Sequence, residues 1–195
     1  MRASVLAIAL LIGCGGAQTV KAPVDRCERD VVLTTSEDVV AAAGCREITG
    51  KLVIRGVGIT TLAPLAKLAR VNGDVHIAGV FSLDSVSGLD ALREVGGNLL
   101  VSGNPIATGV FFPALARVGG NAAVRANGAA LTVSLHKLER VGGSLAVFSN
   151  GSMLRLDLSA LRHIGGAFRV HDNAKLDTFA VAPAIRKRVQ TIKPR

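Results

Sequence analysis

The sequence reads Val118-Gly119-Gly120-Asn121-Ala122-Ala123-Val124 at residues 118–124 and Val141-Gly142-Gly143-Ser144-Leu145-Ala146-Val147 at residues 141–147. Both stretches open with an aliphatic residue, any residue, then glycine. This motif begins at Ile48, Val71, Val95, Val118, Val141 and Ile164, at intervals of 23, 24, 23, 23 and 23 residues. A period of about 20–29 residues held through several units is typical of a solenoid, in which each turn of the chain packs against its neighbours.

The segments around each motif supply the apolar side of one coil. After the motif, apolar residues alternate with other residues, which predicts a short half-buried strand. The inward pairs are Leu52/Ile54, Val75/Ile77, Leu99/Val101, Ala122/Val124, Leu145/Val147 and Phe168/Val170. Further apolar pairs lie six and three residues before the motif: Leu65/Leu68, Leu89/Leu92, Phe112/Leu115, Leu135/Leu138 and Leu158/Leu161. We therefore expect a mainly β fold, a right-handed parallel β-helix or leucine-rich-repeat-like solenoid of about six coils.

Two polar or small columns accompany this core. The repeated glycine of the motif predicts either a turn with positive φ or a close approach between coils, because glycine lacks a Cβ atom. Asparagine recurs at Asn104, Asn127, Asn150 and Asn173, 23 residues apart each time. Stacked in neighbouring coils, these amides would satisfy buried turn backbone. We expect them to form a structural ladder.

The first residues have the form of a signal peptide. Arg2 supplies a positive charge, Val5 to Ile12 is apolar, and Leu11-Ile12-Gly13-Cys14 follows. The last four residues resemble the bacterial lipobox, and that resemblance implies cleavage before Cys14 and acylation of its thiol. The alternative is an ordinary signal peptide that happens to contain a cysteine. Gly15 stands where an inner-membrane retention signal would place Asp, so we expect a lipid-anchored protein exported to the cell envelope, at the outer membrane.

Lipidation of Cys14 would leave Cys27 and Cys45 as the remaining cysteines. An exported protein meets conditions that permit disulfides, and one bridge is the only pairing available to two cysteines. A redox or metal-binding thiol pair is the alternative, but it has no CxxC spacing and no nearby histidine in support.

The run from Cys27 through Gly44-Cys45-Arg46-Glu47-Ile48-Thr49-Gly50, followed by Leu-x-x-Leu-x-x-Val-x-Gly units, resembles the receptor L-domain family of leucine-rich β-helical modules. The resemblance covers residues 27–180 and implies that Cys27–Cys45 seals the N-terminal end of the stack. It transfers no ligand motif, and the paired modules of hormone receptors are missing from this sequence. We expect a signal peptide at 1–13, an acylated tether at 14–26, a solenoid at 27–180 with a cap at 27–47, and a basic cap or tail at 181–195.

The formal charge of +9 is unevenly distributed. The C-terminal cluster contains Arg186, Lys187, Arg188, Lys193 and Arg195, whereas residues 14–184 hold 17 basic and 14 acidic side chains, a balance of +3. A nearly balanced body on an exported chain argues against a nucleic-acid partner. The membrane, through the lipid anchor, is an expected partner.

Catalytic patterns are weak in this sequence. In register, Asp74 would neighbour Lys51 and Asn98, so adjacent coils supply no carboxylate pair for acid–base work. His76, His136, His163 and His171 fall in different columns, and we expect no metal and no cofactor. The sequence favours a non-catalytic binding or structural module with a protein or glycan partner. The alternative is a carbohydrate-active β-helix enzyme acting on an extracellular or cell-wall glycan.

Two surfaces are candidates for that binding. The residue before each motif is Glu47, Arg70, Glu94, Arg117, Arg140 or His163. Arg117 over Arg140 is a candidate anion site, unless the two side chains simply splay into water. The outward strand face is the second candidate and carries Arg55, His76, Leu100, Arg125, Phe148, Arg169 and His171. Packing of this face against a loop is the structural alternative.

Overall fold

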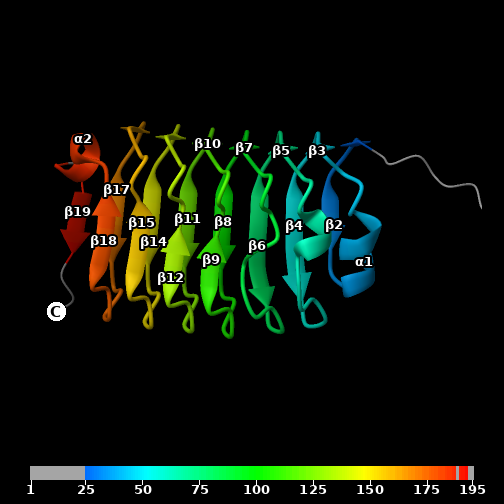
Figure 1. Ribbon diagram of the computed structural model, residues 1–195, viewed down its shortest axis with the longest axis horizontal. Helices are drawn as coiled ribbons and strands as arrows, with labels where there is room; N and C mark the ends of the chain where they lie inside the picture. The colour runs from blue at the N-terminus through cyan, green and yellow to red at the C-terminus, as the bar shows by residue number, and fades with distance from the viewer. Residues whose placement is uncertain (1–24, 188, 193–195) are drawn as a thin grey trace, which may run out of the picture.

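A computed structural model describes residues 25–187 and 189–192, and it is a solenoid of parallel strands (Figure 1). Each central coil contributes one strand to each of three sheets. Sheet A contains β1 (Arg26–Cys27), β3 (Glu47–Ile48), β5 (Arg70–Val71), β7 (Glu94–Val95), β10 (Arg117–Val118), β13 (Arg140–Val141) and β16 (His163–Ile164). The predicted fold class is confirmed.

The other two sheets form the long sides of the coil. Sheet B contains β2 (Val31–Leu33), β4 (Leu52–Gly56), β6 (Val75–Val80), β8 (Leu99–Ser102), β11 (Ala122–Arg125), β14 (Leu145–Phe148), β17 (Phe168–His171) and β19 (Val189–Ile192). Sheet C contains β9 (Gly109–Phe111), β12 (Thr132–Ser134), β15 (Arg155–Leu158) and β18 (Thr178–Val181). Towards the N-terminus, the 3-10 helix η1 (Ala63–Leu65) and helix α1 (Ser36–Ala41) take the place of sheet C (Figure 1).

The core is a set of aliphatic columns enclosed by the three sheets. The alternating residues of sheet B and the apolar pairs that precede each motif are all buried, and Phe112 and Phe168 are the largest side chains among them. Strand pairing is in register, with Ala122 opposite Leu99 on one side and Leu145 on the other. Each coil therefore hides aliphatic surface that it could not bury alone.

The motif glycines are explained by close approach and not by positive φ. A Cβ atom built on Gly73 would lie 2.7 Å from the carbonyl oxygen of Gly50, and one on Gly120 would lie 2.5 Å from Asn98 Oδ1. Positive φ occurs instead one corner later, in the column Gly56, Gly79, Gly103, Ala126, Ser149 and Asp172. Of the two reasons considered for the motif glycine, crowding between coils is therefore the one that applies.

The four asparagines form a hydrogen-bonded ladder at that corner. Asn127 Oδ1 accepts from the backbone N–H and the side-chain amide of Asn104, at 3.2 and 3.0 Å. Asn127 in turn donates to Asn150 Oδ1, and Asn150 donates to Asn173 Oδ1. Asn104, Asn127 and Asn150 are fully buried. The side-chain oxygens thus accept from turn N–H groups, while the side-chain amides donate to carbonyl oxygens of the sheet B strands.

The N-terminal end is closed by a disulfide and a short helix. Cys27 and Cys45 are bonded, with their Cα atoms 5.6 Å apart, which confirms the expected pairing. Helix α1 begins with a capping box in which the Thr35 hydroxyl accepts from the Asp38 N–H. The Asp38 carboxylate accepts from the backbone and hydroxyl of Thr34 and from the Thr35 N–H, and these bonds lower its pKa.

The C-terminal end differs from the expected cap or tail at 181–195. Helix α2 (Pro183–Arg186) turns the chain, and β19 then pairs with β17 in parallel, so Phe168 lies opposite Val189. The solenoid therefore continues past residue 180, and the stack has about one more turn than the six motifs indicate. No helix in residues 25–187 and 189–192 is both long enough and apolar enough to cross a membrane. The predicted signal peptide and the predicted acylation site Cys14 lie outside the described residues.

Candidate functional site

The outer face of sheet B is organised in two rows because the strands pair in register. One row contains His76, Leu100, Ala123, Ala146 and Arg169. Its central members are short and apolar, so this part of the face has no side chain that stands far above the sheet. Arg55 follows a register shift between β4 and β6, and it is exposed.

The second row brings three predicted residues into contact. The rings of Phe148 and His171 are stacked, with centroids 4.9 Å apart and planes 10° from parallel. The guanidinium carbon of Arg125 lies 6.0 Å from the Phe148 centroid, within the range of a cation–π contact. His171 Nδ1 lies 2.8 Å from the Asp172 carboxylate. Phe148 therefore lies between Arg125 on one neighbouring strand and His171 on the other, which leaves its ring edge and the charged groups to meet a partner.

Sheet A divides into two halves of opposite character. In the N-terminal half acids and bases alternate, and Arg70 Nη2 lies 3.0 Å from Glu94 Oε2 while Arg26 Nε lies 4.0 Å from Glu47 Oε2. In the C-terminal half Arg117, Arg140 and His163 pair in register, and no acid interrupts them.

A groove lies over this basic half of sheet A. It has a volume of about 450 Å³ and is lined by Arg117, Glu139, Arg140, Arg162 and His163. The two arginines expected from the sequence thus share one hollow with three further charged or titratable residues. Glu139 and Arg162 were not among the sequence candidates. Their signal was present, since they lie 23 residues apart in the column immediately before the one considered.

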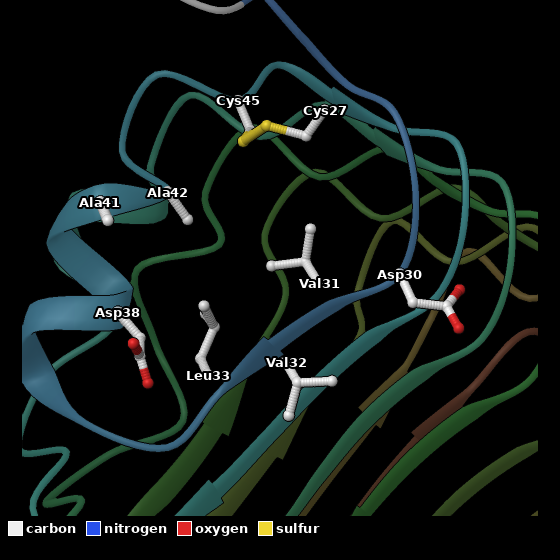
Figure 2. Close-up of a pocket in the computed structure, with 9 residues that line it drawn as sticks. All are labelled: Cys27, Asp30, Val31, Val32, Leu33, Asp38, Ala41, Ala42 and Cys45. Atoms are coloured by element: carbon white, nitrogen blue, oxygen red, sulfur yellow. A yellow bond between two sulfur atoms is a disulfide. The ribbon is translucent and has the colours of Figure 1, made fainter.

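A second hollow opens at the N-terminal end of the stack, with a volume of about 360 Å³ (Figure 2). Figure 2 shows Val31 and Leu33 between β2 and α1, beneath the Cys27–Cys45 disulfide. The hollow is the N-terminal end of the aliphatic core, and within residues 25–187 and 189–192 no further coil packs against it. Only Asp30 and Asp38 contribute charge to its lining. Both carboxylates already accept backbone hydrogen bonds, from Lys51 and from Thr34 and Thr35.

Groups suited to chemistry are sparse in the described part of the chain. Ser134 Oγ lies 3.2 Å from His136 Nδ1, the geometry of a nucleophile beside a base. Asp157 is opposite Ser134 in sheet C, yet its carboxylate accepts from the Ser159 N–H, and no ion pair links an acid to His136 within residues 25–187. The pair therefore lacks the third group that orients an imidazole in a triad.

The same range contains no group of three or more His, Cys, Asp or Glu side chains placed to hold a metal ion. It also contains no buried side-chain nitrogen or oxygen without a hydrogen-bond partner. No polar group inside the solenoid thus calls for a ligand, and the candidate sites lie on its surface.

A further polar ladder, missed in the sequence, follows the motif glycines. Asp74 Oδ1 accepts from the Asn98 N–H at 2.6 Å, Asn98 Oδ1 accepts from the Asn121 N–H at 2.8 Å, and Asn121 Oδ1 accepts from the Ser144 N–H at 2.8 Å. These side chains cap the entry to each strand of sheet B. Their role is structural, which explains why Asp74 has no second carboxylate beside it.

Comparison with known proteins identifies no relative: no protein-family model, no curated protein and no solved structure matches the chain.

Proposed function

We propose that the protein is a non-catalytic binding or structural module of the cell envelope, attached to the membrane by lipid at Cys14, and that it meets a protein or glycan partner through the outer face of sheet B. The observation that carries the proposal is the geometry of that face. Seven strands from β2 to β17 run side by side there, with a flat apolar centre at Leu100, Ala123 and Ala146. Solenoids commonly bind partners through such extended sheets.

The flanks of the face supply groups that give orientation to a partner. Arg125, Phe148 and His171 form one contiguous stack, and Arg169 is exposed in the neighbouring row. Aromatic and arginine side chains are the types that contribute most at protein interfaces. A flat centre with a polar, aromatic margin suits a broad partner surface better than a small molecule, which would require a concave pocket.

Capture of partners from envelope extracts tests this proposal. We expect the double variant Arg125→Glu/Phe148→Asp to lose partners that the unaltered protein retains. The matched control, Arg155→Glu/Phe111→Asp, makes the same two changes on the exposed face of sheet C. An unchanged partner set in the sheet B variant would remove this face from consideration.

Membrane attachment is tested separately through Cys14. The variant Cys14→Ser should fail to incorporate labelled fatty acid and should move from the membrane fraction to the soluble fraction, because two or more acyl chains are needed for stable anchoring. Retention of fatty-acid label in Cys14→Ser would contradict acylation at this residue.

The alternative of a glycan-acting enzyme has one local observation in its favour, the approach of Ser134 to His136. Assay of the purified protein against uronates and cell-wall glycans discriminates between the two proposals. Turnover that disappears in Ser134→Ala would replace the binding proposal with an enzymatic one.

A further inference from the structure

The column of residues that precedes each motif offers an internal comparison. In its first four members, Arg26, Glu47, Arg70 and Glu94, opposite charges are neighbours, and two ion pairs neutralise them within the sheet. The fold therefore accepts an acid in this column without difficulty. In the last three members the same backbone pairing places bases side by side instead.

Like charges directly opposite each other destabilise a sheet. Arg117 is opposite both Glu94 and Arg140, but Glu94 forms its ion pair with Arg70 and not with Arg117. Neither Arg117 nor Arg140 has an ion-pair partner within residues 25–187. The basic half of the column thus carries positive charge that the described chain leaves uncompensated.

The groove collects this charge in one place. Its lining has three arginines, Arg117, Arg140 and Arg162, and one acid, Glu139, so its formal charge is +3 − 1 = +2 with His163 neutral. Arginine is suited to such a site because its planar guanidinium donates paired hydrogen bonds to tetrahedral or planar oxyanions. A volume of about 450 Å³ is within the range of sites that hold small organic ligands.

Charge balance selects among the oxyanions. A carboxylate or a sulfate monoester carries a single negative charge and would leave the groove positive. A phosphomonoester carries about −1.5 to −2 at neutral pH and presents three acceptor oxygens. Of these oxyanions it therefore matches the formal charge of the lining most closely.

We propose that the groove formed by Arg117, Arg140, Arg162, His163 and Glu139 on sheet A binds a phosphomonoester group. The site is separate from the outer face of sheet B and does not depend on the function proposed for that face. The group could belong to a sugar phosphate or to a lipid headgroup, and free inorganic phosphate presents the same oxyanion. The chemistry of recognition is the same in each case.

Calorimetric titration of the purified full-length protein tests the site. Three soluble probes are used: inorganic phosphate, glucose 6-phosphate and unphosphorylated glucose. We expect saturable binding of the first two and none of glucose. Arg140→Gln and, independently, Arg117→Gln should weaken phosphate binding by about tenfold or more, because each removes a charge-assisted donor pair.

Two further variants make the result specific. Arg70→Gln removes a positive charge from the same column in its neutralised half, and it should leave phosphate binding unchanged. Glu139→Gln should strengthen binding, since it removes the one negative charge of the lining. A cooperative melting transition, measured on each variant without ligand, confirms that the titrated protein is folded.

Vesicles identify the source of the group, and they are tested with the Cys14→Ser variant so that no lipid anchor inserts into them by itself. Binding to vesicles that contain phosphatidic acid, with no response to phosphatidylglycerol, would assign the site to a lipid phosphomonoester, whereas preference for glucose 6-phosphate over these vesicles would assign it to a sugar. The proposal is overturned if neither phosphate, glucose 6-phosphate nor phosphatidic acid binds saturably, or if Arg70→Gln weakens binding as much as Arg140→Gln.

Discussion

Replacement of Asn127 by alanine should be among the most destabilising single substitutions in this chain. The side chain is fully buried and takes part in five hydrogen bonds. Its amide donates to the carbonyl oxygens of Val101 and Arg125 and to Asn150 Oδ1, at 3.2, 3.0 and 3.2 Å. Its oxygen accepts both donors of Asn104. Alanine removes all five.

The magnitude follows from what is left behind. Asn104 keeps one bond for its side-chain amide, to the Ile77 carbonyl, but its buried backbone N–H loses its acceptor. A stranded buried donor costs about 1–3 kcal/mol, and each further lost bond costs about 0.5–1.5 kcal/mol net. One stranded donor and four further lost bonds amount to about 3–9 kcal/mol, so we expect a loss of at least about 3 kcal/mol in the free energy of unfolding, against a total of about 5–15 kcal/mol for a typical domain.

Urea denaturation and thermal melting measure this loss. For a protein of this size about 3 kcal/mol corresponds to a fall in melting temperature of about 6–12 °C. The matched control is Asn121→Ala, which removes the same side chain from the exposed ladder, where water can replace its bonds to Asn98 and Ser144. If Asn127→Ala costs no more than Asn121→Ala, the buried ladder does not contribute as argued.

Three other changes test separate parts of the structure. Ala126 adopts a φ of 53° at the position that Gly79 and Gly103 occupy in earlier coils, so Ala126→Gly should raise the free energy of unfolding by about 0.5–1 kcal/mol. The control Ala123→Gly, within strand β11, should lower it. A loss of stability in both variants would refute the argument that Ala126 is strained. Reduction of the Cys27–Cys45 disulfide, or its removal in Cys27→Ser/Cys45→Ser, should lower the free energy of unfolding by about 3 kcal/mol, because it releases a loop with a sequence separation of 18. Melting curves with and without reductant should differ for the unaltered protein and coincide for the double variant. Hydrogen bonds from Thr34 hold the pKa of Asp38 below its ordinary value of 3.8, so their stabilisation is present above pH 3.8 and is lost as the pH falls through the lower pKa of the folded state. Chemical denaturation below pH 4 should therefore show a smaller loss of stability in Asp38→Asn than in the unaltered protein. Equal losses in the two proteins would contradict this explanation.

Most of the fold could be predicted because each coil repeats the same physical problem. The motif sets the register, and once the register is known the inward residues and the asparagine ladder follow from spacing alone. The terminal turns could not be found in this way. Cys27 pairs with Ile48 and Phe168 pairs with Val189 over 21 residues, and neither turn carries the motif glycine. A template of 23 residues passes over both.

The positive φ angles at the corner that follows each sheet B strand could not be predicted for a different reason. The first three residues of the left-handed column are glycines, Gly56, Gly79 and Gly103, but Ala126, Ser149 and Asp172 continue it. Stacking on the preceding coil imposes the conformation on residues that do not favour it. A search for positive φ at regularly spaced glycines therefore selects the motif glycines. Those glycines are required only because the backbones of neighbouring coils approach closely there.

The positions of the candidate surfaces could be predicted from the sequence, but the contacts between their side chains could not. Sequence spacing placed Arg125, Phe148 and His171 in one row, yet only the structure shows that the rings stack on each other. It likewise placed Arg117 over Arg140, and the spacing of 23 residues aligns Glu139 with Arg162 in the next column, but only the structure shows that the two columns line one groove. Packing does not fix the conformations of exposed side chains. The repeat spacing therefore predicts which of them are neighbours, but not which contacts they form.

The position of the basic groove along the solenoid bears on which phosphate could reach it. Sheet A places β10 four strands after β1 and β16 six strands after it. At about 4.8 Å per strand, the groove lies about 19–29 Å from β1, at the N-terminal end of the described stack. Lipid attachment at Cys14, with 10 residues between it and Asp25, would bring that end to the membrane first. An upright solenoid would then hold the groove beyond the headgroups of its own membrane. Binding to phosphatidic acid in the same vesicle requires the stack to lie on its side, whereas a sugar phosphate requires no such orientation, so competition by glucose 6-phosphate on vesicle-anchored protein separates the two arrangements.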